Sequence, residues 1–164
     1  MNNYLFTIKY RFFFSLVFIA FLAGSLPAQT KGFGIGLAFG EPTGICFKNW
    51  IDEEHAITGA VAYSIIDQSN LFGVNVNYTW NRMKTVGYKT RLGFQYGAGL
   101  GITTRKNISS LAAIRITTAA IWYPNFIPID FYFEFAPEIV VYPYSGIGLD
   151  AGAGIRYYFK SAQN

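Results

Sequence analysis

The stretch RLGFQYGAGLGIT, residues 91–103, decides the fold. Small or polar residues occupy every second position of its centre, at Gly93, Gln95, Gly97, Gly99 and Gly101. Large apolar residues and one alanine fill the positions between them. Two interpretations compete: a glycine-rich loop that cradles a phosphate, and one strand whose two faces meet different surroundings. GAGLG lacks the GxGxxG spacing and no helical pattern follows it, so the alternation favours the strand.

The same alternation recurs along the chain after residue 31, interrupted by turn-forming residues at short, even intervals. No segment has helical periodicity. The longest predicted turn is RMKTVGYK, residues 82–89. The pattern predicts eight strands, at 32–40, 43–51, 56–66, 71–81, 91–103, 111–122, 129–141 and 146–159. Bacterial membrane barrels have an even number of strands, and eight is the smallest number found in them.

The two faces of the predicted strands differ in side-chain size and polarity. One carries mainly Phe, Tyr, Trp, Leu, Ile and Val, and the other Gly, Ala, Ser, Thr, Asn, Gln and a few charges. An eight-stranded lumen is only just wide enough for ordinary side chains and cannot hold so many aromatic rings. The sequence therefore predicts an all-β, eight-stranded antiparallel up-and-down transmembrane β-barrel with its apolar face against lipid. The lumen glycines are expected to make room for side chains from across the barrel.

Residues 1–28 have the organisation of a secretory signal peptide, which leaves 29–164 as the barrel domain. Lys9 and Arg11 form a basic segment, and a region of small residues follows the apolar run. That run is shorter than the roughly 20 residues that a membrane-spanning helix needs. Cleavage lowers the number of basic residues from 13 to 11 against 9 acidic ones. The resulting net charge of +2 gives no case for nucleic-acid binding.

The inward face is predicted to carry a lumen charge network. Its members are Lys48, Arg115, Glu134, Glu138, Asp150 and Arg156, three basic and three acidic residues. Arg115 is expected to meet Glu134 or Glu138, because their strands are neighbours. Unpaired charges in so narrow a lumen would be costly, so we expect paired charges that plug it. An ion path in which the pairs exchange partners is the alternative, and a catalytic carboxylate pair is the least favoured interpretation.

Aromatic residues are expected to form girdles at both membrane interfaces. The predicted interfacial residues are Trp80, Trp122 and Phe159 at the rim of the barrel that holds the chain termini, and Tyr142 and Tyr144 at the opposite rim. Trp50 also ends a predicted strand. Its position in the alternation (its parity) places it on the inward face, so it would face lipid only if a bulge intervened. A bulge is likewise expected at Pro137, because proline removes a ladder hydrogen bond.

The last strand, AGAGIRYYF, residues 151–159, has alternating apolar residues and a closing aromatic residue. With its eight-strand pattern, the mature chain resembles the small bacterial outer-membrane barrels, the group that contains OmpX and the membrane domain of OmpA. Ile155, Tyr157 and Phe159 match the terminal signal that the barrel-assembly machinery binds in that group. Residues 160–164 depart from the pattern, since members usually stop at the aromatic residue. The segment GEPTGICFKNWI, residues 40–51, is also similar to one in uncharacterised small barrel proteins.

The resemblance implies a location in the outer membrane of a Gram-negative-type bacterium, with both termini in the periplasm. The implied partners are outer-membrane lipid, lipopolysaccharide, and the assembly machinery during biogenesis, and the barrel would be a monomer. Some barrels of this size modify lipid A with a histidine at the outer rim. The single histidine, His55, lies in the acidic turn DEEHA on the other side, and the single cysteine, Cys46, is expected to be a small buried residue. No catalytic residue, metal or cofactor is predicted.

The expected function is that of a non-enzymatic integral outer-membrane protein with a structural or envelope-surface role. A small channel is the alternative, a lipid A-modifying enzyme is less favoured, and the lumen volume disfavours a soluble binder. A basic cluster is expected in the longest turn, at Arg82, Lys84, Lys89 and Arg91. The outer connections are short, which argues against an elaborate adhesin.

Overall fold

The computed structural model of the protein describes residues 32–40, 42–64, 71–86, 90–105 and 108–159. The expected signal peptide, Lys89 and residues 160–164 lie outside this part of the chain. The strands are β1 Phe33–Gly40, β2 Thr43–Trp50, β3 His55–Tyr63, β4 Phe72–Val86, β5 Thr90–Arg105, β6 Ile108–Pro124, β7 Ile129–Tyr142 and β8 Gly146–Tyr158. The described residues contain no helix long and apolar enough to cross a membrane.

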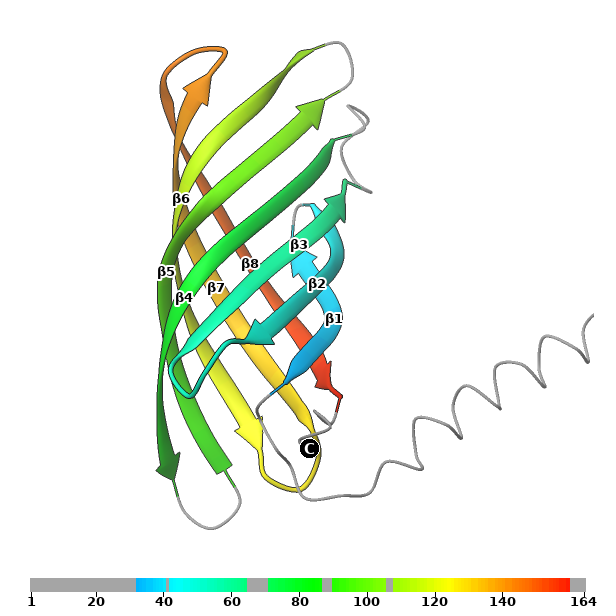
Figure 1. Ribbon diagram of the computed structural model, residues 1–164. Helices are drawn as coiled ribbons and strands as arrows, with labels where there is room; N and C mark the ends of the chain where they lie inside the picture. The colour runs from blue at the N-terminus through cyan, green and yellow to red at the C-terminus, as the bar shows by residue number, and fades with distance from the viewer. Residues whose placement is uncertain (1–31, 41, 65–70, 87–89, 106–107, 160–164) are drawn as a thin grey trace, which may run out of the picture.

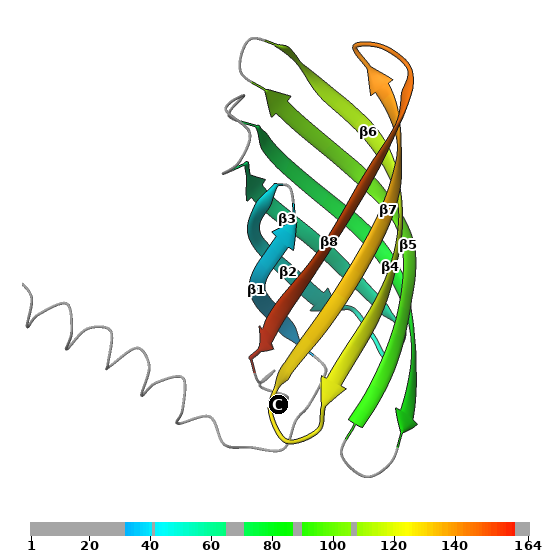
Figure 2. The ribbon, with the colours of Figure 1, turned by 180° about the vertical axis from the view of Figure 1, so that it is seen from behind.

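Each strand pairs antiparallel with the next, and β8 pairs antiparallel with β1, which closes the sheet into a barrel. In the closing ladder Gly36 lies opposite Arg156 and Gly40 opposite Gly152. Figures 1 and 2 show the tilted strands from two sides. The prediction of an all-β, eight-stranded antiparallel up-and-down barrel is confirmed. We call the end where β1 begins and β8 ends the proximal end, and the opposite end the distal end.

The hairpin of β4 and β5 is longer than predicted. Val86 lies opposite Thr90 in the register, so most of the predicted turn at 82–89 is strand. The outward residues of β4 change from aromatic to basic after Trp80, at Arg82 and Lys84. An exposed strand end accepts polar and basic side chains. Because a polar run is typical of turns as well, the sequence prediction was wrong at this place.

The wall formed by β1, β2 and β3 is shorter than the rest of the barrel. These strands have 8, 8 and 9 residues, whereas β5 and β6 have 16 and 17. Because β1 ends at Gly40, residues 146–151 of β8 have a neighbour in β7 and none in β1. In Figure 1 the distal ends of β1 and β2 lie well below those of β5 and β6. The barrel therefore has a low side at its distal end.

Side chains divide between the two faces of the sheet as the alternation predicts. Large apolar side chains are exposed on every strand, for example Leu100 on β5 and Phe133 on β7. The inward face is buried, but it is not limited to small and polar residues. Trp50, Tyr123 and Tyr158 pack together in the proximal half of the lumen. The expectation of a uniformly small inward face was therefore incomplete.

Gly97 and Gly99 of the stretch that decides the fold lie against the backbone of β4. A Cβ atom at Gly97 would lie 2.1 Å from the carbonyl oxygen of Tyr78, and one at Gly99 would lie 2.2 Å from that of Val76. No residue other than glycine permits so close an approach of neighbouring strands. For these two positions the structure corrects the prediction that the glycines make room for side chains from across the barrel.

Neither Trp50 nor Pro137 lies at a bulge. The β2–β3 register is continuous up to Trp50, which keeps its inward parity and is buried. The β7–β8 register is continuous as well, with Pro137 opposite Leu149. The β6–β7 ladder has no pairs between Arg115–Glu138 and Thr118–Phe135, the interval that contains Pro137, and its register shift lies between Ala112 and Ala113. The expected loss of ladder pairing at Pro137 is therefore confirmed, whereas the expected bulge is corrected.

Candidate functional site

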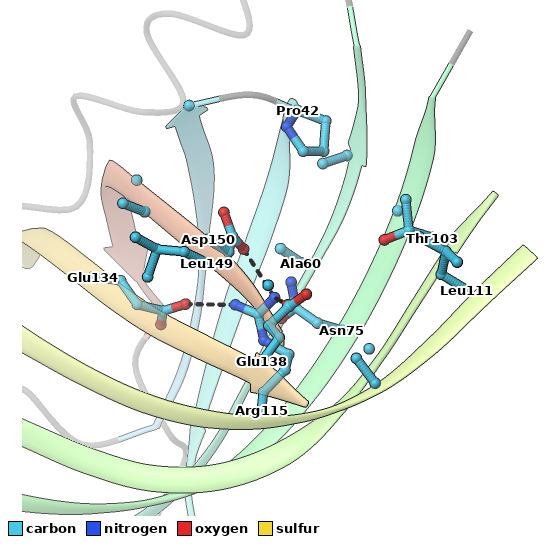
Figure 3. Close-up of a pocket in the computed structure, with 18 of the residues that line it drawn as sticks. Pro42, Ala60, Asn75, Thr103, Leu111, Arg115, Glu134, Glu138, Leu149 and Asp150 are labelled. Atoms are coloured by element: carbon cyan, nitrogen blue, oxygen red, sulfur yellow. Dashed lines mark hydrogen bonds and ion pairs between the residues drawn. The ribbon is translucent and has the colours of Figure 1, made fainter. Parts of the chain in front are cut away.

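One basic and three acidic side chains meet inside the barrel, as Figure 3 shows. The Nη1 atom of Arg115 donates hydrogen bonds to Glu138 and, at 2.8 Å, to Asp150, and its Nη2 atom donates to Glu134 at 3.1 Å. The Arg115 side chain is 4% exposed, whereas those of Glu134, Glu138 and Asp150 are 18%, 19% and 32% exposed. We call these four residues the distal cluster. Its guanidinium is enclosed while its carboxylates remain partly accessible.

Consecutive strands bring the distal cluster together. Arg115 lies opposite Glu138 in the β6–β7 register, and Asp150 lies on β8 opposite Ala136. Since alternate residues of a strand point to the same face, Glu134 and Glu138 both enter the lumen from β7. Arg115 was expected to meet one of these two glutamates, and in the structure it contacts both of them.

The distal cluster lines a cavity of about 460 Å³ in the distal half of the lumen. Figure 3 shows the polar residues Asn75 and Thr103 and the apolar residues Ala60 and Leu111 among those that line it. The volume lies in the range of about 300–1,000 Å³ that is typical of small-molecule sites. This half of the lumen is therefore not plugged, contrary to the expectation for the whole lumen.

A buried ion pair that sequence analysis missed lies in the proximal half. Asp130 is fully buried and accepts hydrogen bonds from Nε and Nη2 of Arg156, at 2.9 Å and 3.0 Å, and from the hydroxyl of Tyr158. The guanidinium carbon of Arg156 lies 4.2 Å from the ring centroid of Tyr132. The inward parity of Asp130 within its predicted strand was the signal that could have found it. Arg156 thus belongs to a pair of its own and not to the distal cluster.

Lys48 is buried, and its hydrogen-bond partners are neutral. Its Nζ atom donates hydrogen bonds to the side-chain oxygens of Asn81, of Gln95 at 2.9 Å and of Tyr123 at 3.3 Å. The same atom lies 4.2 Å from the ring centroid of Trp50. No carboxylate in the described part of the chain forms an ion pair with Lys48. The expectation that all the lumen charges are paired is therefore wrong for this residue.

The lumen charges do not balance locally. The distal cluster has three carboxylates against one guanidinium. The proximal half has Lys48 and Arg156 against the single carboxylate of Asp130. Asp130 makes the acidic residues four against three basic ones, which corrects the expected three-to-three balance. Negative charge is therefore concentrated at the cavity, and positive charge lies in the packed half.

The proximal half of the lumen is filled by side chains. Trp50, Ile121, Tyr123 and Tyr158 pack against one another, and the hydrogen bonds of Lys48 connect β2 with β4, β5 and β6. We call this region the proximal plug; it consists of Lys48, Trp50, Asn81, Gln95, Ile121, Tyr123, Asp130, Arg156 and Tyr158. The plug leaves the distal cavity as the accessible part of the lumen among the described residues.

The predicted interfacial aromatic residues Trp80, Trp122, Tyr142, Tyr144 and Phe159 are all exposed, and Tyr144 also lines the distal cavity. Trp80 stacks on Tyr96 with ring centroids 5.9 Å apart, and Trp122 stacks on Phe131 at 5.2 Å. Trp80 does not end its strand as expected, because β4 continues to Val86. The position of these rings at a membrane interface stays a prediction.

The expected assembly signal lies along the end of β8. Ile155 and Tyr157 are two residues apart on this strand and lie on the same face of it. Phe159 follows the last residue of the strand, Tyr158. The rings of Tyr157 and Phe159 meet edge to face with centroids 5.3 Å apart. Recognition of these residues by the assembly machinery stays a prediction.

His55 begins β3 at the proximal end and belongs to a hydrogen-bonded acidic turn. Its ring lies 2.7 Å from a carboxylate oxygen of Asp52. The backbone N–H groups of Glu54 and His55 both donate to Asp52, which lowers the pKa of that carboxyl below its ordinary value. Glu54 pairs with Arg82 of β4. Across the described residues, no group of three or more His, Cys, Asp or Glu side chains could hold a metal ion.

Comparisons with models of protein families, with curated proteins and with solved structures find no match to this chain. The closed eight-stranded barrel is consistent with an OmpX-like protein.

Proposed function

We propose that the protein is a non-enzymatic integral outer-membrane β-barrel with a structural or envelope-surface role, closed to ions by its proximal plug. The observation that carries this proposal is the apolar outer surface. Exposed residues such as Ile45, Val61 and Leu149 extend it over the strands of the short wall and β8. Soluble monomers rarely expose contiguous apolar patches larger than a few hundred Å². A barrel satisfies its backbone groups internally, which lets such a surface lie in hydrocarbon.

The pattern along β4 supports a membrane position. Its outward residues from Phe72 to Trp80 are large and apolar, and Arg82 and Lys84 follow. This apolar length matches the roughly 9–11 residues with which a tilted strand crosses a bilayer. An aromatic residue followed by basic ones is also what a membrane–water interface favours. The proposal therefore places the proximal interface near Trp80.

The resemblance to OmpX-like barrels supports the remaining parts of the proposal. These are cleavage of residues 1–28, a monomer in the outer membrane of a Gram-negative-type bacterium, assembly by the barrel-assembly machinery, and contact with lipid and lipopolysaccharide. A lipid A-modifying role is less favoured, because His55 lies at the proximal end, away from the expected outer leaflet. The small channel remains the second candidate, and the distal cavity is the observation that favours it.

We expect the purified protein to be electrically silent in planar lipid bilayers, because the proximal plug fills half of the lumen. Arg115→Ala should be silent as well, since Arg115 lies on the distal side of the plug. Each sample should first show a compact band on an SDS gel that slows on boiling, which identifies a folded barrel. Steady single-channel currents in the wild type that change in Arg115→Ala would contradict the closed lumen and favour the channel.

A further inference from the structure

The distal cavity has the shape and the charge of a binding site that the structural role does not use. Arg115 and the three carboxylates of the distal cluster line one part of the cavity, which we call the floor. The net charge of the floor is −2. Each carboxylate contacts the guanidinium through one oxygen only. The other three oxygens have no hydrogen-bond donor among the described side chains. The three carboxylates are 18–32% exposed, so this excess negative charge is open to a cation that enters the cavity.

Two further buried groups beside this floor have no partner. Asn77 is 1% exposed and Thr58 is 4% exposed, and neither Asn77 Oδ1 nor Thr58 Oγ1 has a hydrogen-bond partner in the described part of the chain. Both line a space of about 20 Å³, which shares Asn75 and Glu134 with the large cavity. A carboxylate or amide oxygen only accepts hydrogen bonds. Asn77 Oδ1 therefore lacks a donor, whereas the Thr58 hydroxyl can donate or accept, and Nε of Arg115 is a buried donor without a partner.

We propose that the distal cavity binds a small organic cation, a primary amine with a short apolar tail. Its ammonium group would donate to the free carboxylate oxygens of Glu134, Glu138 and Asp150. Its tail would lie along the apolar lining, to which Ala62, Leu111, Ala113 and Val140 contribute. An ammonium group supplies three donors and one positive charge, which complements this set of acceptors.

The arrangement of the carboxylates favours an organic cation over a metal ion. All three converge on the guanidinium of Arg115, which occupies the position that a shared metal ion would need. The remaining oxygens belong to side chains that line the cavity and are open to a ligand in it. The apolar lining above them has no role in binding a bare ion, but it would bury a hydrocarbon tail.

The low side of the barrel gives such a ligand a lateral path. Residues 146–151 of β8 have no partner in β1, and Ile147 and Leu149 of this segment are strongly exposed and also line the cavity. If the outer face lies in lipid, Ile147 and Leu149 place this side of the cavity next to the bilayer. This lateral path rests on the proposed function, whereas the charge of the floor does not.

The test is calorimetric titration of the folded barrel in detergent at pH 7 with n-hexylamine, and with 1-hexanol as the uncharged equivalent. We expect hexylamine to bind at least about tenfold more tightly, which corresponds to one charge-assisted hydrogen bond. The double variant Glu134→Gln/Asp150→Asn keeps acceptors for Arg115 but brings the charge of the floor to zero. It should lose at least about tenfold in hexylamine affinity. Glu54→Gln removes the same kind of charge at the proximal end and should bind as the wild type does.

Equal binding of hexylamine and hexanol, or unchanged affinity in the double variant, would overturn the inference. Binding of Ca²⁺ without binding of hexylamine would overturn it too, because the site would then take an inorganic cation. If the double variant does not fold, Asp150→Asn replaces it, since Asp150 is the most exposed of the three acids. A wild type that is a heat-modifiable, silent barrel and binds no amine would overturn this inference and leave the proposed function intact.

Discussion

Replacement of Asp130 by alanine is expected to lower the free energy of unfolding of the barrel by about 3–5 kcal/mol. Asp130 is fully buried and compensates the charge of Arg156 through two hydrogen bonds. Without the carboxylate, the guanidinium and the Tyr158 hydroxyl remain buried without their acceptor. Urea titration of the protein in lipid vesicles measures the change, with the fraction of compact, heat-modifiable species as the readout.

A double variant separates the ion pair from mere loss of packing. In Asp130→Leu/Arg156→Met both charges are replaced by apolar groups, and such exchanges are often neutral or stabilising. We therefore expect the double variant to recover most of the stability that Asp130→Ala loses. A loss below about 1 kcal/mol in Asp130→Ala, a value typical of exposed ion pairs, would show that the pair is not buried as described.

Gly99→Ala is expected to destabilise the barrel by about 3 kcal/mol, the upper end of the usual range for overpacked sites. The added methyl group would lie 2.2 Å from the carbonyl oxygen of Val76 and 2.6 Å from the Cα atom of Asn77. Neither backbone atom can move without separation of β4 from β5. The same urea titration measures the effect, and a lower yield of heat-modifiable protein is expected as well.

Gly73→Ala is the matched control for Gly99→Ala. Gly73 also lies on the inward face of this hairpin, but its Cβ atom would meet ordinary contacts, 3.6 Å from Pro42 and 3.8 Å from Thr103. Because alanine restricts the unfolded chain, a neutral effect or a gain of about 0.4–1 kcal/mol is expected there. Equal stability of the two alanine variants would contradict the close approach of β4 and β5.

The strand count, the order of the strands and the orientation of their faces could be predicted from the sequence. The reason is physical: a period of two and a difference in size between the faces are local properties that survive in any barrel of this kind. Residues such as Leu100 and Phe133 therefore lie on the outside as predicted. The prediction of a turn at residues 82–89 was wrong, because polar residues are equally suited to a turn and to a strand exposed to water.

The contacts across the lumen could be predicted only in part. Parity indicates that a side chain points inward, but the partner it reaches depends on the stagger of the strands and on side-chain length. Lys48 on β2 reaches Gln95 on β5, which no local pattern indicates. Arg115 and Glu138 lie on adjacent strands, and their contact could be expected from strand order alone. Asp130 was overlooked although its parity was available.

The measurement that tests the central claim most directly is quenching of tryptophan fluorescence by brominated lipids. The chain has three tryptophans: Trp80 and Trp122 are exposed on the outer face, and Trp50 is buried in the lumen. Variants that keep one tryptophan each, with phenylalanine at the other two positions, are refolded into vesicles of brominated phosphatidylcholine. We expect strong quenching of Trp80 and Trp122 and little quenching of Trp50. Absence of quenching at Trp80 and Trp122 in folded protein would contradict a membrane-embedded barrel with its apolar face toward lipid.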